Sequence, residues 1–210
     1  MGSRVSEIKR YQIRVEGIVQ GVGFRPFIYG LAIKSCYSGY VLNDVEGVLL
    51  EIQGRDIDIE NFCQCIRAKA PKASYITNIS YHEIDVICDD KEFIIQKSPQ
   101  GLTKETLISP DLAICEDCKR EIKDKNNRRY QYAFTNCTNC GPRFSIVQDI
   151  PYDRQNTTMK VFPMCKKCED EYTNPLDRRF HAQPNACDIC GPQYKLVADK
   201  VYTANESIFI

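Results

Sequence analysis

Eight of the twelve cysteines in this chain of 210 residues fall into four Cys-x-x-Cys pairs, and each pair can present two thiolates to one metal ion. The pairs are Cys115 and Cys118, Cys137 and Cys140, Cys165 and Cys168, and Cys187 and Cys190. Two pairs complete a closed tetrahedral site with Zn–S bonds of about 2.3 Å, so the spacing predicts two structural zinc ions. A redox Cys-x-x-Cys is expected once rather than four times, and iron–sulfur clusters usually use more closely spaced cysteines.

The cysteine region is duplicated. A shift of 50 residues superposes Cys115 on Cys165, and it also superposes Arg128-Arg129 on Arg178-Arg179. The duplication favours pairing within each repeat, and pairing across the repeats, as in the cysteine-rich domain of DnaJ chaperones, is the alternative. His181 is a further possible ligand, but each site already has four thiolates, so we expect it to contact a ligand residue or to line a surface. His82, on a predicted strand, has no partner in sequence and is interpreted as an ordinary residue.

A second group of residues could bind a phosphate group. The segment Gln20-Gly21-Val22-Gly23-Phe24-Arg25 joins a strand pattern to a helix pattern, and backbone N–H groups at a helix N-terminus favour an anion. The glycines permit a tight turn and leave room for an oxyanion, while the Arg25 guanidinium can grip two phosphate oxygens. Taken alone, the Gly-x-Gly turn could equally be a tight connection. It is neither a Walker A loop nor a complete dinucleotide-binding fingerprint.

The elements around this segment predict an α+β fold. Apolar alternation predicts a strand over residues 10–19, and Pro26 marks the start of a helix that reaches Cys36. The remaining predicted elements are a hairpin of residues 39–43 and 48–53, a helix around residues 59–66, and strands at 74–86 and 92–97. The order is βαββαβ, the ferredoxin-like arrangement, with the last strand read as bent or broken.

The strings Gly17 to Arg25 and Gly39 to Val48 closely resemble the acylphosphatase family, over residues 10–98. The resemblance implies that Arg25 binds the phosphoryl group and that Asn43 positions the attacking water. Without it, Asn43 would be read as a strand-end residue that satisfies a turn. Because the motif holds no general base, phosphate binding, charge neutralisation and a water held in line would carry the reaction, with a substrate oxygen accepting the proton.

Three strings of the cysteine region, residues 134–144, 151–154 and 178–184, resemble the zinc region of the HypF family of hydrogenase-maturation carbamoyltransferases. Proteins of that family also begin with an acylphosphatase-like domain, so the resemblance covers residues 10–192. It implies hydrolysis of carbamoyl phosphate here, use of ATP by a downstream YrdC-like domain, and transfer of the carbamoyl group to a HypE-type partner.

The same resemblance predicts how the chain is divided. An acylphosphatase-like domain would occupy residues 1–98, a linker 99–110, and a double zinc-finger domain 111–194, with residues 195–210 as the start of a missing YrdC-like domain. We therefore expect an N-terminal fragment that hydrolyses carbamoyl phosphate and lacks transferase activity.

Composition limits the alternatives. The 28 basic and 28 acidic side chains give zero net charge, which argues against nucleic acid as a partner. No run approaches the ~18 apolar residues of a membrane span, and no secretory signal is present, so we expect a cytoplasmic protein with reduced cysteines. The alternative function is a zinc-dependent scaffold, or a DnaJ-like or nucleic-acid-binding module, with an inactive acylphosphatase-like fold.

Overall fold

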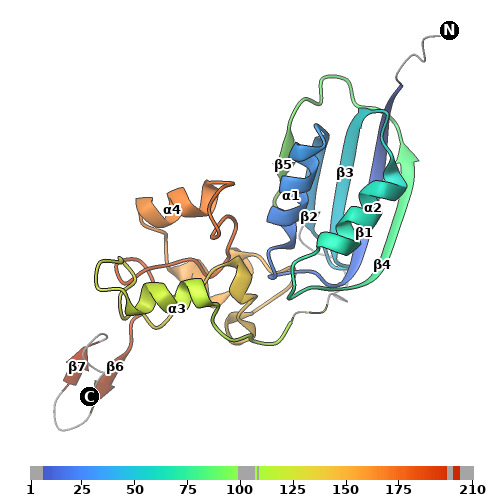
Figure 1. Ribbon diagram of the computed structural model, residues 1–210. Helices are drawn as coiled ribbons and strands as arrows, with labels where there is room; N and C mark the ends of the chain where they lie inside the picture. Colours follow the sequence, from blue (N-terminus) through green and yellow to red (C-terminus); the bar gives the residue numbers. More distant parts are fainter. Residues whose placement is uncertain (1–6, 99–106, 108, 198–200, 204–210) are drawn as a thin grey trace.

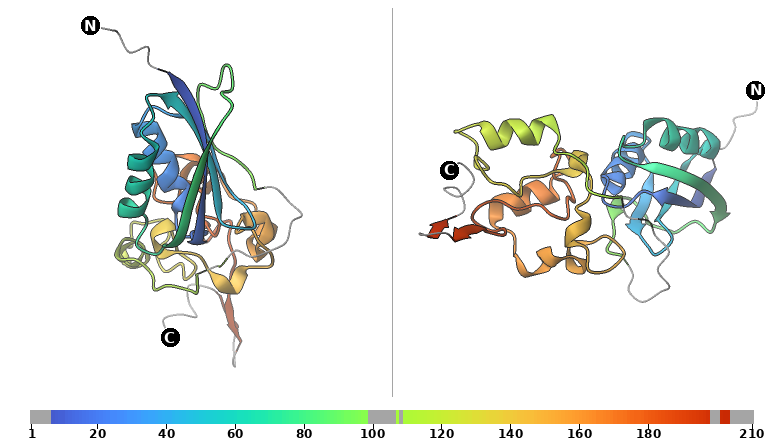
Figure 2. Two further views of the ribbon diagram at one scale, coloured as in Figure 1. Left: turned by 90° about the vertical axis from the view of Figure 1, so that its right-hand side faces the viewer. Right: turned by 90° about the horizontal axis from the view of Figure 1, so that it is seen from below.

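The computed structural model describes residues 7–98, 107, 109–197 and 201–203. These residues form two parts that lie side by side (Figures 1 and 2). We call residues 7–98 the sheet half and residues 109–197 the cysteine half. The cysteine half meets the sheet half at the end of the sheet where the segment between β1 and α1 lies, and this contact becomes important for the site (Figure 1).

A single mixed sheet forms the sheet half. Among the described residues five strands pair in the order β4-β1-β3-β2-β5, and all neighbours are antiparallel except β2 and β5. The strands are β1 (Ile8–Ile18), β2 (Ser38–Asn43), β3 (Val48–Arg55), β4 (Tyr75–Ile84) and β5 (Phe93–Ile95). The predicted α+β class is confirmed, and the predicted order of elements holds as far as β4.

Two helices, α1 (Phe24–Lys34) and α2 (Ile59–Lys69), cover one face of the sheet (Figures 1 and 2). The alternation along β1 points Ile13 and Val15 into the core beneath them, where both are fully buried. Burial of such apolar surface contributes about 25 cal/mol per Å² and is the main stabilising term of this half. Asp58 caps α2, since its carboxylate accepts a hydrogen bond from the Asn61 backbone N–H at 3.0 Å.

The start of α1 differs from the prediction. The helix begins at Phe24, so Pro26 is its third residue rather than its first. The shift costs no hydrogen bond, because the first four N–H groups of a helix have no partner within the helix.

The last strand is the larger correction. Residues 74–86 and 92–97 do not form one bent or broken strand: β4 lies beside β1 at one edge of the sheet, and β5 lies parallel to β2 at the opposite edge. The connecting segment is held by the Gln53 side chain, which exchanges hydrogen bonds of 2.8 and 2.9 Å with the Ile87 backbone. Phe93 of β5 is buried and completes the core edge-to-face against Tyr29.

The cysteine half contains little regular structure. Its helices α3 (Glu116–Lys123) and α4 (Lys166–Thr173) each begin directly after the first cysteine of a repeat, Cys115 and Cys165. Short 3-10 turns occupy Thr138–Cys140, Phe144–Ile146, Arg154–Asn156 and Thr158–Val161, and β6 (Lys195–Val197) pairs antiparallel with β7 (Val201–Thr203).

Parts of the predicted linker (99–110) and of the predicted tail (195–210) lie outside the described residues. The proposed domain boundaries therefore stay predictions. In the part of the chain that the structure describes, no helix has both the length and the apolar character needed to cross a membrane.

Candidate functional site

The glycine loop, residues 20–25, connects β1 to α1. Gly21 and Gly23 have φ values of +72° and +77°, a conformation that L side chains rarely adopt. The 11-residue helix α1 starts at Phe24, so its unpaired N–H groups and the positive end of its dipole lie at the loop. The loop thus has the form of an anion-binding site.

The cysteine half lies directly against this loop. A Cβ atom at Gly21 would lie 2.5 Å from the Cβ of Pro142, and one at Gly23 would lie 3.0 Å from the Cβ of Thr138. The two glycines are therefore required for close packing as well as for the turn. The sequence explained them by the turn and by access for a phosphate group, and it gave no sign of the contact between the halves.

Gln20 joins three segments. Its buried side-chain NH₂ donates to the carbonyl oxygens of Asp44 and Gly47, both at 2.7 Å, and its oxygen accepts from the Tyr152 N–H at 2.9 Å. The first two bonds fix the β2–β3 turn against the glycine loop, and the third fixes the cysteine half. The Gln20 side chain therefore holds the site together, while its backbone belongs to the loop.

Arg25 and Asn43 lie together, although 18 residues separate them in the chain. Asn43 is the last residue of β2, and its amide oxygen accepts from Nε and Nη2 of Arg25 at 3.2 and 3.3 Å. The opposite orientation of the amide would direct its NH₂ group at these donors, so the oxygen must face the guanidinium. Both side chains are buried. The structure thus brings together the two residues for which the sequence predicted a catalytic role.

Two acceptors from the cysteine half complete the surroundings of Arg25. Nη1 of Arg25 lies 2.7 Å from Oδ1 of Asp153, and Nη2 donates to the Tyr152 carbonyl oxygen at 3.5 Å. Burial raises the pKa of the Tyr152 hydroxyl to about 12, so the side chain stays neutral. Sequence reasoning assigned no role to Tyr152 or Asp153. The segment Pro151 to Arg154 stood out in the sequence. A role at this site could not be inferred from it, because that role depends on a contact between segments that are distant in the chain.

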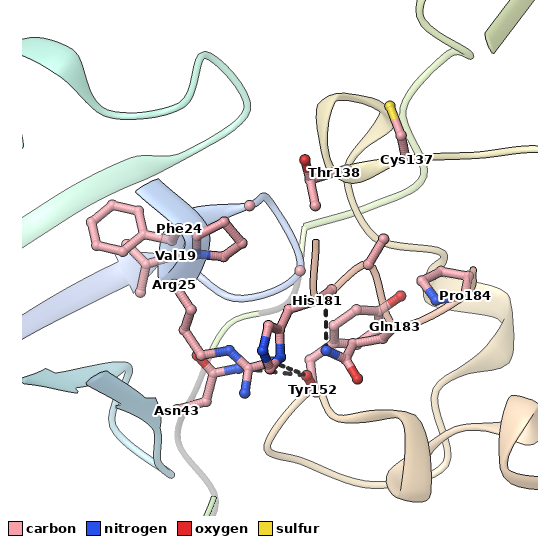
Figure 3. A pocket seen from close by; sticks show the side chains of 15 residues that line it. Val19, Phe24, Arg25, Asn43, Cys137, Thr138, Tyr152, His181, Gln183 and Pro184 are labelled. Carbon is pink, nitrogen blue, oxygen red and sulfur yellow. Dashed lines mark hydrogen bonds between the residues drawn. The ribbon is translucent and has the colours of Figure 1, made fainter. Parts of the chain in front are cut away.

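His181 also belongs to the site. Its side chain lies beside Arg25 and Asn43 (Figure 3). Burial, reinforced by the positive charge of Arg25, lowers the pKa of the imidazole to about 4. His181 is therefore neutral at pH 7, and it lines the surface at the glycine loop, which is one of the two placements expected from the sequence. His82 is exposed on β4.

Two cavities meet at Arg25 and His181. The smaller one, about 20 Å³, lies between the glycine loop and the cysteine half and has room for about one water molecule. The larger one, about 430 Å³, is lined by basic residues that include Arg25, Lys97 and Lys160, together with Asp153. An anion that approaches Arg25 through the larger cavity therefore moves past side chains that are mainly positively charged.

The cysteines form two clusters, each within one repeat. Among the described residues, two groups bring four Sγ atoms together, Cys115, Cys118, Cys137 and Cys140 in the first cluster and Cys165, Cys168, Cys187 and Cys190 in the second. Sγ–Sγ separations of 3.6 to 3.9 Å match the edge of about 3.8 Å that four Zn–S bonds of 2.3 Å would give. Disulfide bonds, at about 2.05 Å, are excluded at these distances. The donor set fits a tetrahedral thiophilic ion.

Each repeat supplies arginines to the cluster of the other. Arg128 donates to Sγ of Cys168 at 3.1 Å, and Arg178, its counterpart 50 residues later, donates to Sγ of Cys118 at 2.9 Å. The charge of four thiolates around one divalent ion is negative, so these guanidinium groups offset it. The sequence showed the repeated Arg-Arg pairs but not that they are exchanged.

The second arginine of each pair is buried and paired with a glutamate. Arg129 is 1% exposed and bonds to Glu171 and to the Ala186 carbonyl oxygen, the latter at 2.9 Å. Burial alone would raise the pKa of Glu171, but the hydrogen bonds and charge of Arg129 outweigh it and hold that pKa below its ordinary value. Arg179 repeats the arrangement with Glu121.

Two family models match the chain. Residues 11–95 match the acylphosphatase family, and residues 114–147 and 164–197 match the HypF finger. The chain is 47% identical over 148 residues to the probable carbamoyltransferase HypF of Methanocaldococcus jannaschii, covering 70% of this chain and 19% of that protein. It is also 47% identical over 158 residues to the carbamoyltransferase HypF of Rhodobacter capsulatus, covering 75% and 21%.

A crystal structure of full-length HypF in a phosphate- and nucleotide-bound form is 48% identical and superposes with a TM-score of 0.82, covering 95% of this chain and 27% of that one. The sheet half alone is 42% identical over 77 residues to the acylphosphatase of Thermotoga petrophila, of which 84% is covered. The chain thus spans about one fifth of the length of the curated carbamoyltransferases it matches.

Proposed function

The chain is homologous to the N-terminal region of the HypF carbamoyltransferases, and from this we propose that it hydrolyses carbamoyl phosphate at the glycine loop. The observation that carries the proposal is the buried Arg25–Asn43 pair at the start of α1. Use of ATP, and transfer of the carbamoyl group to a HypE-type partner in [NiFe]-hydrogenase maturation, are proposed for the whole protein and not for this part.

In the proposed reaction the loop N–H groups and Arg25 bind the phosphoryl oxygens, and Asn43 holds a water molecule in line with the bond to be broken. The water oxygen forms a bond to phosphorus while the bond between phosphorus and the acyl oxygen breaks. A phosphate oxygen accepts the water proton, and carbamate leaves as an anion. An activated acyl phosphate has a good leaving group, so a strong general base is not needed.

Asp153 and a substrate phosphate group would compete for Arg25, since both are anions that accept from its guanidinium. The cavity of about 20 Å³ at the loop is too small for a phosphoryl group. We therefore propose that substrate entry displaces the Asp153 carboxylate from Nη1 of Arg25 and shifts the Tyr152–Asp153 segment away from the loop.

We further propose that each four-cysteine cluster holds one structural zinc ion. Thiolate ligands and the spacing of the Sγ atoms favour zinc over harder cations such as Mg²⁺ or Ca²⁺. All four positions of each cluster are occupied by protein ligands, so the ions would stabilise the fold and leave no open position for substrate.

The test is a carbamoyl-phosphate hydrolysis assay on this chain, with zinc measured by elemental analysis. Arg25→Ala should lower kcat/KM by about 10²- to 10³-fold, because it removes a preorganised charge from the phosphoryl group. Arg67→Ala, at an exposed arginine of α2, is the matched control and should leave the rate unchanged. Full activity in Arg25→Ala would contradict the proposed site, and fewer than two zinc ions per chain would contradict the metal assignment.

A second candidate function is favoured by the contacts of Tyr152. Its N–H binds Gln20 and its carbonyl oxygen binds Arg25, so the cysteine half fixes the position of the glycine loop. The cysteine half would then act as a zinc-dependent scaffold for the site. Both functions can hold together, and loss of hydrolysis on zinc removal would support the scaffold.

A further inference from the structure

His181 lies in the second cysteine repeat but faces the catalytic residues of the sheet half. It lines both cavities, and Arg25 is the residue of the sheet half that lines both with it. Figure 3 shows its ring next to the side chains of Arg25 and Asn43. The imidazole therefore borders the space into which a substrate held by Arg25 would extend.

The duplicated repeat provides an internal comparison. Gln131 stands 50 residues before His181 and has the same left-handed backbone, with φ of +60° against +53°. Its N–H donates to the Ile122 carbonyl oxygen at 2.8 Å, as that of His181 donates to Tyr172 at 2.9 Å. The fold of the repeat thus explains the backbone conformation at both positions but does not require a histidine, and Gln131 lines neither cavity.

The imidazole is held in place by its neighbours. Its ring packs against Tyr172 and Phe180, with ring centroids 4.9 and 4.7 Å away, and Phe180 packs in turn against Tyr29 of α1 at 5.4 Å. The low pKa of His181 keeps one ring nitrogen available as a hydrogen-bond acceptor at neutral pH. A rigid and uncharged acceptor suits recognition of an uncharged polar group.

The geometry of the proposed reaction determines which part of the substrate reaches His181. If the loop and Arg25 hold the phosphoryl group, the acyl group must point away from the loop N–H groups, toward the surface that the cysteine half provides. We propose that His181 is a specificity residue of the acyl-phosphate site, whose imidazole accepts a hydrogen bond from the amide of carbamoyl phosphate. This inference rests on the proposed function, and it adds a preference for carbamoyl over acetyl phosphate.

Size alone cannot give this preference, because the methyl group of acetyl phosphate and the amide group of carbamoyl phosphate are nearly equal in volume. Only the amide donates a hydrogen bond, and a site that contains a matching acceptor rejects the analogue that lacks the donor.

The experiment compares kcat/KM for carbamoyl and acetyl phosphate in the chain and in three variants. His181→Leu should lower the ratio of the two values about fivefold to tenfold, the worth of one hydrogen bond. His181→Gln should keep most of the ratio, because its amide oxygen can accept and Gln131 shows that glutamine tolerates this backbone. Gln131→Leu, the matched control in the first repeat, should leave the ratio unchanged.

The outcomes separate the inference from the proposed function. Equal losses with both substrates in His181→Leu would assign His181 a structural role and overturn the inference. Equal rates with both substrates in the unmodified chain, lost in Arg25→Ala, would overturn it while the proposed function stands. Hydrolysis of neither substrate would overturn both. Should His181→Leu fail to fold, as judged by zinc content, His181→Ala takes its place, since it also lacks an acceptor, and a ratio unchanged from that of the unmodified chain would overturn the inference.

Discussion

The two halves of the molecule are stabilised in different ways. The sheet half buries a continuous apolar core between one face of the sheet and its two helices, made of residues such as Ile13, Leu50 and Ile66. In the cysteine half the buried side chains are largely cysteines and polar groups, and the apolar cluster around Tyr132 is small. The comparison indicates that the sheet half can fold by hydrophobic burial, and we expect the cysteine half to depend on the metal ions proposed for its two clusters.

Metal removal should produce the largest difference in stability between the two halves. Structural zinc sites of this type contribute on the order of 10–16 kcal/mol of apparent folding free energy, and little else in the cysteine half can replace it. A strong chelator should therefore abolish protection from hydrogen exchange in α3 and α4 while β1 and β3 remain protected. Hydrogen exchange followed by mass spectrometry measures both in one sample.

The same experiment can contradict the comparison. If β1 and β3 lost protection together with α3 and α4, the sheet half would depend on the cysteine half. If α3 and α4 kept their protection after complete zinc removal, the polar contacts alone would hold them. Restoring zinc provides the control, because the original exchange pattern should return.

Arg129→Ala tests how the two repeats depend on each other. The change removes the buried partner of the partly buried Glu171, and breaking a buried ion pair typically costs about 3–5 kcal/mol, less what Arg128, 3.2 Å from the same carboxylate, retains. Although Arg129 belongs to the first repeat, exchange should rise first in α4 of the second repeat, because Glu171 and Cys168 lie there. Arg179→Ala should have the converse effect on α3, and urea unfolding gives the free energies.

Leu50→Ala is the matched control in the sheet half. Leu50 is fully buried opposite Ile13, and its truncation should cost about 2–5 kcal/mol through lost burial and a cavity. The zinc content should stay at its original value in this variant and fall more readily in Arg129→Ala. Equal zinc loss in the two variants would show that the halves unfold as one unit.

The sequence predicted what depends on local pattern. Period-two alternation located β1 and β3, the hairpin pattern located β2, and the spacing of Phe62, Cys63 and Ile66 located α2. Cysteine spacing alone identified the eight residues that form the two clusters. The roles of Arg25 and Asn43 came from resemblance to a family, since no local rule would place a strand-end asparagine beside that arginine.

What the sequence did not predict depends on contacts between distant segments. β5 pairs with β2 because that edge of the sheet is the one left open to Phe93. A strand of three residues is too short for its sequence to indicate with which strand it pairs. Tyr152 and Asp153 are more than 120 residues from Arg25 in the chain, and they contact it only because the two halves pack together. The exchange of arginines between the repeats could not be predicted either. Both repeats carry the same arginines and cysteines at the same spacing, so the sequence does not indicate which arginine contacts which cluster.

The smallest predicted effect reports directly on the contact between the halves. The folded protein holds the pKa of His181 at about 4, below the ordinary value of 6.5, through burial and the charge of Arg25. The unfolded chain therefore binds a proton more readily in this range, and stability is lost as the pH falls from 6.5 toward 4. Above pH 6.5 both states are neutral at this residue, so it has no effect there.

His181→Gln has no titrating group at this position. Between about pH 7 and pH 5 the unmodified chain should lose roughly 2 kcal/mol more of its unfolding free energy than the variant, as expected for a pKa lowered this far. Because both proteins carry the same cysteine clusters, acid effects on zinc cancel in the difference. If the unfolding free energy of both proteins fell equally between pH 7 and pH 5, His181 would titrate as it does in water, and the halves would be apart in solution. A difference of the stated sign would mean that the sheet half, which folds by its own core, keeps the imidazole buried against Arg25.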